Sequence, residues 1–372
     1  MKIDFYISSL SSGGAEHVMA NLARYFAAGD NEVNLISYEK RPQFYNIDKN
    51  VNVIKYNNKA KNRFFLSLFV EVFRDIRDTV RRLKKGKPQV AVSFLSRCNI
   101  MLIIAGIFSK SRIVVCDRNY LLKEYPGYIF AISCFFYRFA DAVIVQTHEV
   151  KKTYPKYLQN KIFVLENPLD FKELELQCIK EDTKNSDEND IKRENTVLSV
   201  GRLEKQKDFK TLINAFKKTA AKFPDWKLKI FGQGCMKKEL EAYIKNIGMC
   251  DRIKLCGVTH TPFFEMKKAG IFVLSSFYEG FPNVLCEAMY AKTPCVSTRC
   301  KCGPSDIIKD AVNGYLVDIG DEVKMAEKME FLMGNGEERK TMGERAFESV
   351  KYLDINRVFL RWDKVLHKIV DL

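Results

Sequence analysis

The sequence lacks the residue patterns of a metal site or a disulfide framework. Its four histidines are scattered and its eleven cysteines contain no CxxC pair. Cys300 and Cys302 form only a CxC, far from any histidine cluster. A structural zinc site needs four such ligands at close spacing, so we expect none. We expect the thiols to stay reduced, as in the cytosol, because an odd number of scattered cysteines makes no disulfide framework.

Long hydrophobic runs are also missing. The most apolar stretches, 99–109 and 129–137, are broken by charge within about a dozen residues, which is too short to span a bilayer. The opening residues, MKIDFYISSL, are typical of a strand and contain no apolar core of a secretory signal. We therefore expect a soluble or peripheral protein in the cytoplasm.

Apolar residues and positive charge are both abundant. The 372 residues are 47% hydrophobic and 12% aromatic, which excludes wholesale disorder. A chain of this length is expected to form two domains. Lysine and arginine number 61 against 46 acids, a formal net charge of +15. This excess favours anionic partners: nucleic acid, anionic lipid or phosphorylated small molecules.

Strand-like segments alternate with helix-period segments along the chain, which predicts parallel sheets joined by right-handed crossovers. The expected strands are 3–8, 32–37, 51–55, 90–94, 113–116, 142–146, 162–165, 196–200, 227–231, 253–256, 271–274 and 293–297. Residues 180–195 are almost purely polar and predict a linker. The prediction is therefore an α/β protein with doubly wound domains at 1–170 and 196–355. A charged linker or excursion is expected at 171–195, and a final helix at 356–372 is expected to pack back toward the first domain.

Two glycine-containing loops follow predicted strands. Gly13 and Gly14 precede a helical stripe of apolar residues, and a helix N-terminus beside such a pair is suited to bind an anion. An ordinary strand-to-helix turn is the alternative. Neither this loop nor FGQGCMKK at 231–238 completes GxGxxG, so a dinucleotide dehydrogenase is unsupported.

A basic loop and two glutamates form the other candidate site. Gly201 ends a predicted strand and is followed by Arg202 and Lys207, which can neutralise phosphate oxygens at the carboxyl edge of the sheet. A solvated basic loop is the alternative. Glu279 and Glu287 lie eight positions apart in apolar surroundings. A glycosidase pair is disfavoured because this spacing does not place two carboxylates on either side of one bond, and it leaves both cations unexplained.

These motifs, taken in order, resemble those of the retaining GT-B glycosyltransferases of family 4 (group 1). The similar segments are SSGGAEHVMANLA, VCDRN, ENPLD, Gly201-Arg202…Lys207, IFGQGCMKKEL, LCGVTH, Glu279-x7-Glu287 and KCGPSDII…NGYLV, and they run from residue 1 to about 355. The chain most resembles bacterial transferases of lipid-linked polysaccharide or N-glycan assembly, including N-acetylgalactosamine transferases acting on undecaprenyl-diphosphate glycans. The resemblance implies two Rossmann-like domains that face a central cleft.

The resemblance also implies a role for each matching residue. Glu287, expected at the start of a helix, would bind the ribose hydroxyls, and Glu279 would lie near the donor sugar. Arg202 and Lys207 would neutralise the leaving diphosphate. The remaining donor contacts would come from Gly14, Gly201, Val258 (framing the base), Phe281, Asn283 and Val284. On the acceptor side the candidates are Gly13, His17 and Arg118, and some relatives have histidine where Arg118 stands.

The implied chemistry needs no metal and no other cofactor. No DxD motif lies where a donor diphosphate would need one, and fixed cations with helix N-termini can stabilise the departing charge. Retention is implied to occur without an enzymic nucleophile, because the acceptor attacks the face from which the diphosphate leaves.

Residues 61–87 predict an amphipathic, strongly basic helix. From Lys59 to Lys87 there are ten basic and three acidic residues. The apolar positions at helical spacing are Phe65, Leu68, Phe69, Val72, Phe73, Ile76, Val80 and Leu83. Such a helix is typical of proteins that bind an anionic membrane surface. There, the arginines would meet headgroups or the pyrophosphate of the acceptor; they are Arg74, Arg77, Arg81 and Arg82. A core-facing helix with a solvated basic side is the alternative.

We therefore expect transfer of a hexose or N-acetylhexosamine from a UDP-sugar, possibly UDP-GalNAc, to a lipid-linked (undecaprenyl-diphosphate) glycan. The enzyme is expected at the inner face of the cytoplasmic membrane, in the synthesis of cell-surface polysaccharide, lipopolysaccharide or N-glycan. The alternatives are a sugar-nucleotide epimerase, a catalytically silent lipid-binding scaffold and a nucleic-acid-binding protein. The last is suggested by charge alone, and because no reader motif accompanies the charge we expect no nucleic-acid partner.

Overall fold

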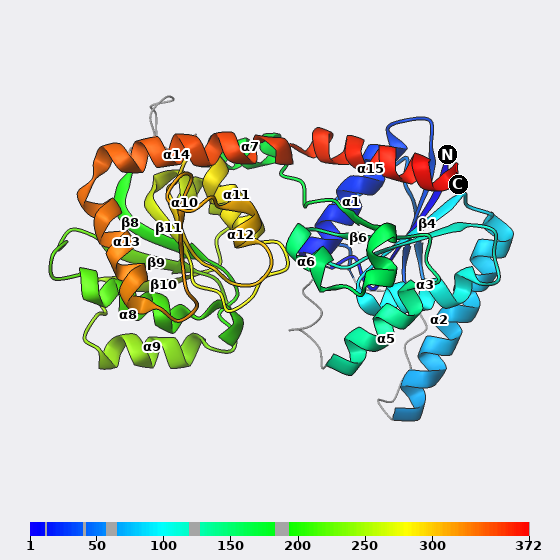
Figure 1. Ribbon diagram of the computed structural model, residues 1–372, viewed down its shortest axis with the longest axis horizontal. Helices are drawn as coiled ribbons and strands as arrows, with labels where there is room; N and C mark the ends of the chain where they lie inside the picture. The colour runs from blue at the N-terminus through cyan, green and yellow to red at the C-terminus, as the bar shows by residue number, and fades with distance from the viewer. Residues whose placement is uncertain (12, 40–41, 57–64, 119–126, 183–192, 372) are drawn as a thin grey trace. The chain divides into compact units, whose positions relative to one another are not determined.

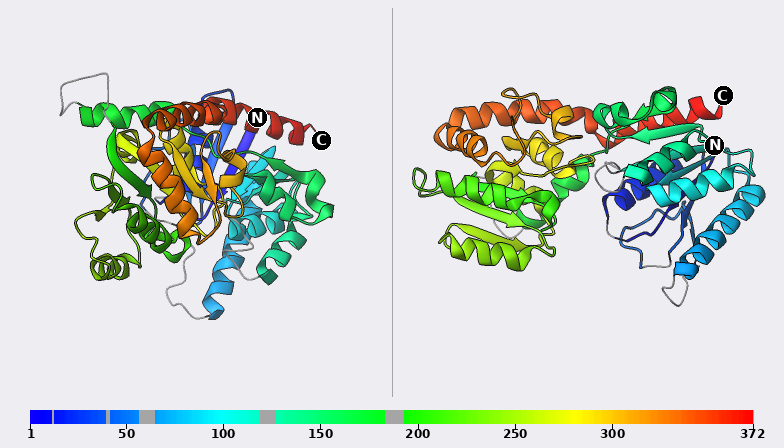
Figure 2. Two further views of the ribbon diagram at one scale, coloured as in Figure 1. Left: turned by 60° about the vertical axis from the view of Figure 1, so that its left-hand side comes forward. Right: turned by 60° about the horizontal axis from the view of Figure 1, so that its bottom comes forward.

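The computed structural model describes residues 1–11, 13–39, 42–56, 65–118, 127–182 and 193–371. The chain divides into two compact units, Met1–Pro168 with Asn356–Leu372, and Leu169–Ile355. Each unit is a parallel sheet covered by helices (Figures 1 and 2), which confirms the predicted α/β class.

The first unit contains a seven-stranded sheet in the order β3-β2-β1-β4-β5-β6-β7. The strands are β1 (Lys2–Ile7), β2 (Glu32–Ser37), β3 (Asn52–Lys55), β4 (Val90–Phe94), β5 (Arg112–Cys116), β6 (Ala142–Val145) and β7 (Ile162–Val164). The described helices are α1 (Gly14–Ala27), α2 (Phe65–Gly86), α3 (Ser96–Gly106), α5 (Gly127–Tyr137), α6 (His148–Thr153), η1 (Lys156–Lys161) and α15 (Ile355–Val370). The central strands are continuous apolar runs because helices cover both faces of a parallel sheet.

A buried ion pair fixes the C-terminal part of α2 to this sheet. Asp4 of β1 is fully buried, and it accepts hydrogen bonds from Arg82 Nε (3.0 Å) and Nη2 (3.2 Å) and from Asn34 Nδ2 (2.8 Å). These hydrogen bonds to Asp4 raise the pKa of Arg82. A carboxylate can be buried at this position because its oxygens are paired with a cation and an amide.

The second unit contains a six-stranded sheet in the order β10-β9-β8-β11-β12-β13. The strands are β8 (Glu194–Val200), β9 (Lys227–Phe231), β10 (Ile253–Gly257), β11 (Ala269–Leu274), β12 (Cys295–Thr298) and β13 (Tyr315–Val317). The helices are α7 (Phe171–Asp182), η2 (Lys205–Lys207), α8 (Phe209–Thr219), α9 (Lys237–Asn246), α10 (Pro262–Lys268), α11 (Asn283–Tyr290), α12 (Pro304–Ile307), α13 (Glu322–Gly334), α14 (Gly336–Val350) and η3 (Lys351–Leu353).

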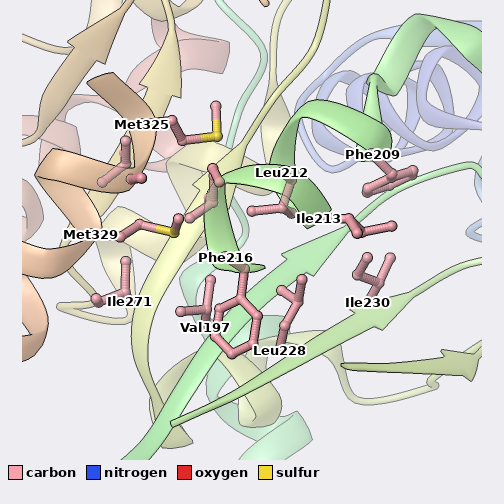
Figure 3. Packing of buried hydrophobic residues seen from close by; sticks show 14 of the residues in the cluster. Val197, Phe209, Leu212, Ile213, Phe216, Leu228, Ile230, Ile271, Met325 and Met329 are labelled. Carbon is pink, nitrogen blue, oxygen red and sulfur yellow. The ribbon is translucent and has the colours of Figure 1, made fainter. Parts of the chain in front are cut away.

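Helices α8 and α13 bury one face of the second sheet (Figure 3). Leu212 and Phe216 are separated by four residues, so they share one side of α8, and both are fully buried. Met325 and Met329 repeat that spacing on α13 and belong to the same apolar cluster. This packing fixes α8, and with it the loop that joins β8 to α8.

Several details differ from the prediction. Residues 171–182, placed in a charged linker by the sequence, form α7, whose Gln177 accepts a hydrogen bond from the Phe263 N–H of α10. The rest of that linker up to residue 192 lies outside the described residues. Strand β13 was not predicted, because a three-residue strand is too short to show a period. The units meet in sequence at Pro168 and Leu169, and from Asn356 onward the chain belongs to the first unit.

No helix within the described ranges is both long and apolar enough to cross a membrane.

Candidate active site

The candidate site lies at the topological switch point of the second sheet, where successive crossovers change direction. Strand β8 is flanked by β9 and β11, and ligands bind beyond the carboxyl ends of such central strands in doubly wound sheets. The loop after β8 carries Lys207 and the loop after β11 carries Glu279.

Glycines allow three strand ends to come close together here. The Gly201 N–H donates to Phe231 O (2.9 Å), and the Gly232 N–H donates to Gly257 O (2.7 Å). A Cβ atom on Gly232 would lie 1.8 Å from Gly201 O, so no other residue fits without moving the backbone. A Cβ atom on Gly201 would lie 3.1 Å from Lys207 Cε, which shows that the lysine stem runs over this glycine.

The turn between η2 and α8 fixes the backbone of Lys207. Asp208 adopts a left-handed conformation (φ 43°, ψ 49°), and its side chain caps α8 by accepting from the Thr211 N–H. The Ser275 hydroxyl, just after β11, donates to Lys207 O at 2.7 Å.

Gln206 joins the two loops that carry the charged pair. Its carbonyl accepts from the Phe277 N–H (2.8 Å), and its side-chain amide donates to Tyr278 O (2.9 Å). The segment before Glu279 is therefore held against η2 by both backbone and side-chain hydrogen bonds.

Lys207 and Glu279 form a nearly buried ion pair. Lys207 Nζ lies 2.6 Å from Glu279 Oε1, and the two side chains are 13% and 8% exposed. The Ser276 hydroxyl donates to the same oxygen at 2.5 Å. Among the described residues Oε2 receives no hydrogen bond, so this oxygen is available to a ligand hydroxyl. The structure thus brings together two of the predicted catalytic residues.

Arg202 does not join this pair. Its side chain is 68% exposed, and its contacts with Glu204 (3.4 Å) and Gln206 (3.3 Å) are long. Contacts of this length contribute little, so the guanidinium can turn toward a ligand at small cost.

Helix α11 begins at Asn283, four residues earlier than expected. Glu287 therefore lies in the second turn of the helix rather than at its start, because the turn at Pro282 already closes the first helical hydrogen bonds. The Asn283 N–H donates to Phe281 O, whereas the described residues provide no backbone acceptor for the Val284 N–H. The amide free to meet a phosphate at this helix end is therefore that of Val284.

A further loop, residues 299–303, lies beside Glu279. Gly303 has φ +106°, and a Cβ atom there would lie 2.6 Å from Pro282 Cδ. Burial and, secondarily, the charge of Glu279 raise the pKa of the Cys300 thiol to about 12. Val258 follows Gly257 at the end of β10 and is 57% exposed, so a ligand base could reach it.

In the first unit, Gly13 and His17 lie at the N-terminus of α1. Gly13 caps the helix and Gly14 is its first residue. The Tyr45 hydroxyl donates to Gly13 O (3.1 Å), and the His17 ring stacks on the Tyr45 ring with centroids 4.8 Å apart.

Arg118 is buried without a carboxylate partner among the described residues. Its Nη1 donates to Asn167 Oδ1 at 2.5 Å, and its guanidinium carbon lies 4.0 Å from the Phe94 ring centroid and 5.7 Å from that of Trp362. Within the part of the chain that the structure describes, Nε and Nη2 have no hydrogen-bond partner. Burial lowers the pKa of Arg118, because the charged guanidinium is removed from water without a described carboxylate paired to it.

The neighbouring Asp117 is fully satisfied, unlike Arg118. It accepts hydrogen bonds from the hydroxyls of Tyr137 and Tyr154 and from Asn99. This buried network fixes the chain at the end of β5, which in turn fixes the backbone of Arg118.

The four arginines of the basic helix do not share one environment. Arg74, Arg77 and Arg81 are exposed, and the last two lie 3.0 and 3.5 Å from Asp78. Arg82 is only 21% exposed and is bound to Asp4. The placement of Arg82 among the lipid-contacting residues therefore needs correction, because its guanidinium holds α2 to the sheet.

Within the described ranges, no three His, Cys, Asp or Glu side chains gather closely enough to hold a metal ion. The sequence reasoning also missed several supporting residues, namely Gln206, Ser276, Gly232 and Gly303. Only the glycines had a recognisable signal, in the FGQG and KCGPSD loops.

Comparison with models of protein families identifies the family. Residues 12–173 match the model described as Glycosyltransferase Family 4, and residues 181–349 match the model described as Glycosyl transferases group 1. The chain belongs to this glycosyltransferase family. The two models together span most of both units.

Similar curated glycosyltransferases cover nearly the whole chain. The GalNAc-α-(1→4)-GalNAc-α-(1→3)-diNAcBac-PP-undecaprenol α-1,4-N-acetyl-D-galactosaminyltransferase of Campylobacter jejuni is 27% identical over 99% of each chain. The amylovoran biosynthesis glycosyltransferase AmsD of Erwinia amylovora is 26% identical over 96% of this chain and 97% of that protein.

Solved structures of glycosyltransferases share the fold. HepE of Anabaena, crystallised with UDP, superposes with a TM-score of 0.80 at 17% identity, over 99% of this chain and 100% of that one. Sucrose-phosphate synthase of Thermosynechococcus elongatus gives 0.83 at 16% identity, over 99% and 98%. The fold is therefore that of the GT-B glycosyltransferases.

Proposed function

We propose that this glycosyltransferase moves a hexose or N-acetylhexosamine from a UDP-sugar to an undecaprenyl-diphosphate-linked glycan, with retention of configuration. The observation that carries the proposal is the Lys207–Glu279 pair, held at the carboxyl edge of the second sheet beside the N-terminus of α11. The Campylobacter relative, whose named acceptor is an undecaprenol-linked glycan, supports the acceptor class.

In the proposed donor complex, Lys207 and Arg202 neutralise the diphosphate. Lys207 is already in place, and Arg202 turns in from its exposed position. The Val284 N–H adds a fixed dipole to the same charge. Glu287 accepts the ribose hydroxyls, and Glu279 Oε2 accepts a hydroxyl of the sugar.

The transfer step breaks the bond between the anomeric carbon and the β-phosphate oxygen. The acceptor hydroxyl oxygen forms its bond on the same face of the anomeric carbon, so configuration is retained. Its proton passes to the departing phosphate oxygen. We propose that no metal takes part, because two cations and one helix end can offset the charge that develops on UDP.

The acceptor side of the proposal rests on the first unit. Arg74, Arg77 and Arg81 form an exposed basic row on α2 that can meet an anionic membrane surface or a pyrophosphate. Arg118 has two guanidinium nitrogens that no described residue pairs, and they can receive an anionic or hydroxyl group of the acceptor; His17 is a second candidate. Such an enzyme would work peripherally, on the inner face of the cytoplasmic membrane.

A panel of sugar nucleotides tested with extracted lipid-linked oligosaccharide, scored by mass shift, examines this proposal. One donor should add mass to the acceptor in the parent chain, and the Glu287→Gln variant should lose that addition. Glu344→Gln, an exposed change elsewhere in the second unit, is the matched control and should retain it. Consumption of the donor without acceptor would instead indicate an epimerase or a hydrolase, and no shift with any donor would contradict the proposal.

A further inference from the structure

Helix α5 exposes an apolar stripe that the proposed chemistry does not use. Its sequence, GYIFAISCFFY, contains no charged residue. Tyr128, Ile132 and Phe135 are 66%, 47% and 52% exposed, and Phe139, just after the helix, is 54% exposed. Spacings of four, three and four residues place these side chains on one face.

The opposite face of α5 is packed, so the stripe has a fixed orientation. Ser133, Cys134 and Tyr137 are buried, and the Tyr137 hydroxyl donates to Asp117 at 2.6 Å. The Phe130 ring lies 5.2 Å from the Tyr154 ring. The helix therefore exposes three large apolar side chains while its buried face, beside Tyr137, carries a serine and a cysteine, which is unusual for a surface helix.

Cations and further aromatic rings border the stripe. The Arg138 guanidinium lies 5.7 Å from the Phe135 ring centroid and 5.6 Å from that of Tyr157, a residue 57% exposed. Lys161 Nζ donates to Arg138 O and so brings a second cation to the same end of the helix.

The basic helix α2 lies on the same side of the sheet as α5. Right-handed crossovers from β3 to β4 and from β5 to β6 run in one direction across the sheet, so their helices cover one face. Both helices pack against α3 (Figure 1). On α2, Phe73 is 70% exposed and precedes the exposed Arg74.

We propose that the α5 stripe enters the interfacial layer of an anionic bilayer, while Arg138 and the basic row of α2 contact the headgroups. At 1.5 Å per residue the helix is about 16 Å long, too short to cross a hydrocarbon core of about 30 Å, so it lies in the interface. A bilayer fits better than a second copy of the chain, because pairing two such faces would bring their arginines together. The inference deepens the membrane part of the proposed function and rests on it.

Vesicle binding by the full chain tests the inference without donor or acceptor. On vesicles of equal parts phosphatidylglycerol and phosphatidylcholine, Ile132→Asp combined with Phe135→Asp should weaken binding roughly 100-fold. The reason is that two apolar side chains which enter the bilayer on binding are lost. Val323→Asp combined with Phe331→Asp, on α13 of the second unit, is the matched control: its residues are 51% and 48% exposed, and binding should be unchanged.

A second measurement does not depend on the folding of the aspartate variant. In Phe135→Trp, emission should be quenched by brominated lipid in the same vesicles, whereas Phe331→Trp should not be quenched. Quenching in neither variant, or a dimer that dissociates when the aspartates are introduced, would overturn the inference. If the parent chain binds vesicles through α5 yet transfers no sugar, the proposed function fails while this inference stands.

Discussion

Removing one member of the Lys207–Glu279 pair should cost far more than removing both. The side chains are 13% and 8% exposed and their charged atoms are 2.6 Å apart, so either charge alone would be left nearly buried. Breaking such a pair costs about 3 kcal/mol or more, whereas replacing both partners by apolar residues is nearly neutral. We expect Lys207→Met and Glu279→Met each to lower the free energy of unfolding by about 3 kcal/mol, and the double variant by no more than about 1 kcal/mol.

Urea unfolding monitored by tryptophan fluorescence can measure the stability of the second unit in the single and double variants. Trp226 lies in the second unit and Trp362 in the first, so a Trp362→Phe background leaves one reporter in the unit that carries the site. Lys210 and Glu239 are the control pair, also 2.6 Å apart but 46% and 51% exposed. Their removal should leave the unfolding curve in place, because water screens an exposed pair.

Activity should follow a different pattern from stability. Each single variant and the double variant should lose turnover by about 100-fold. Lys207→Met and the double variant remove a cation that stabilises the leaving diphosphate, whereas Glu279→Met removes the acceptor of the sugar hydroxyl and the partner that positions Lys207. A double variant as unstable as the sum of the single variants would refute the reasoning about burial. A double variant with full turnover would refute the assigned role.

Three further predictions follow from the same geometry. Gly232→Ala should destabilise the second unit by about 3 kcal/mol in the same unfolding assay, because its Cβ would overlap Gly201 O, whereas Gly248→Ala, with open space around it, should cost about 1 kcal/mol. Turnover measured in EDTA should equal that in magnesium, and loss of activity with EDTA would contradict the metal-free mechanism. Burial raises the pKa of Cys300 from 9.0 to about 12, so its contribution to stability is complete below pH 9 and is lost as the pH rises toward 12. Mass spectrometry should find this thiol unalkylated in the native chain below pH 9.

The sequence was sufficient for the fold and for the identity of the charged pair. Every predicted strand appears within a few residues of its expected place, because parallel strands covered on both faces are short apolar runs between helical periods. Gly201 and the two cations that follow it, Arg202 and Lys207, likewise mark the end of β8 in the sequence itself.

Contacts between distant residues could not be predicted in this way. Arg82 looked like its neighbours on a basic helix, yet Asp4, 78 positions earlier, binds it. Likewise, Gln206 holds the two loops of the candidate site together through atoms of residues 277 and 278, and nothing in the local pattern distinguishes it from a solvated side chain. Such pairings depend on how the sheet brings its strand ends together.

A crystal structure of the full chain with bound UDP tests the central claim most directly. The account predicts the β-phosphate within ion-pair distance of Lys207, with Arg202 turned inward and the ribose hydroxyls on Glu287. A nucleotide bound away from these three side chains would contradict it.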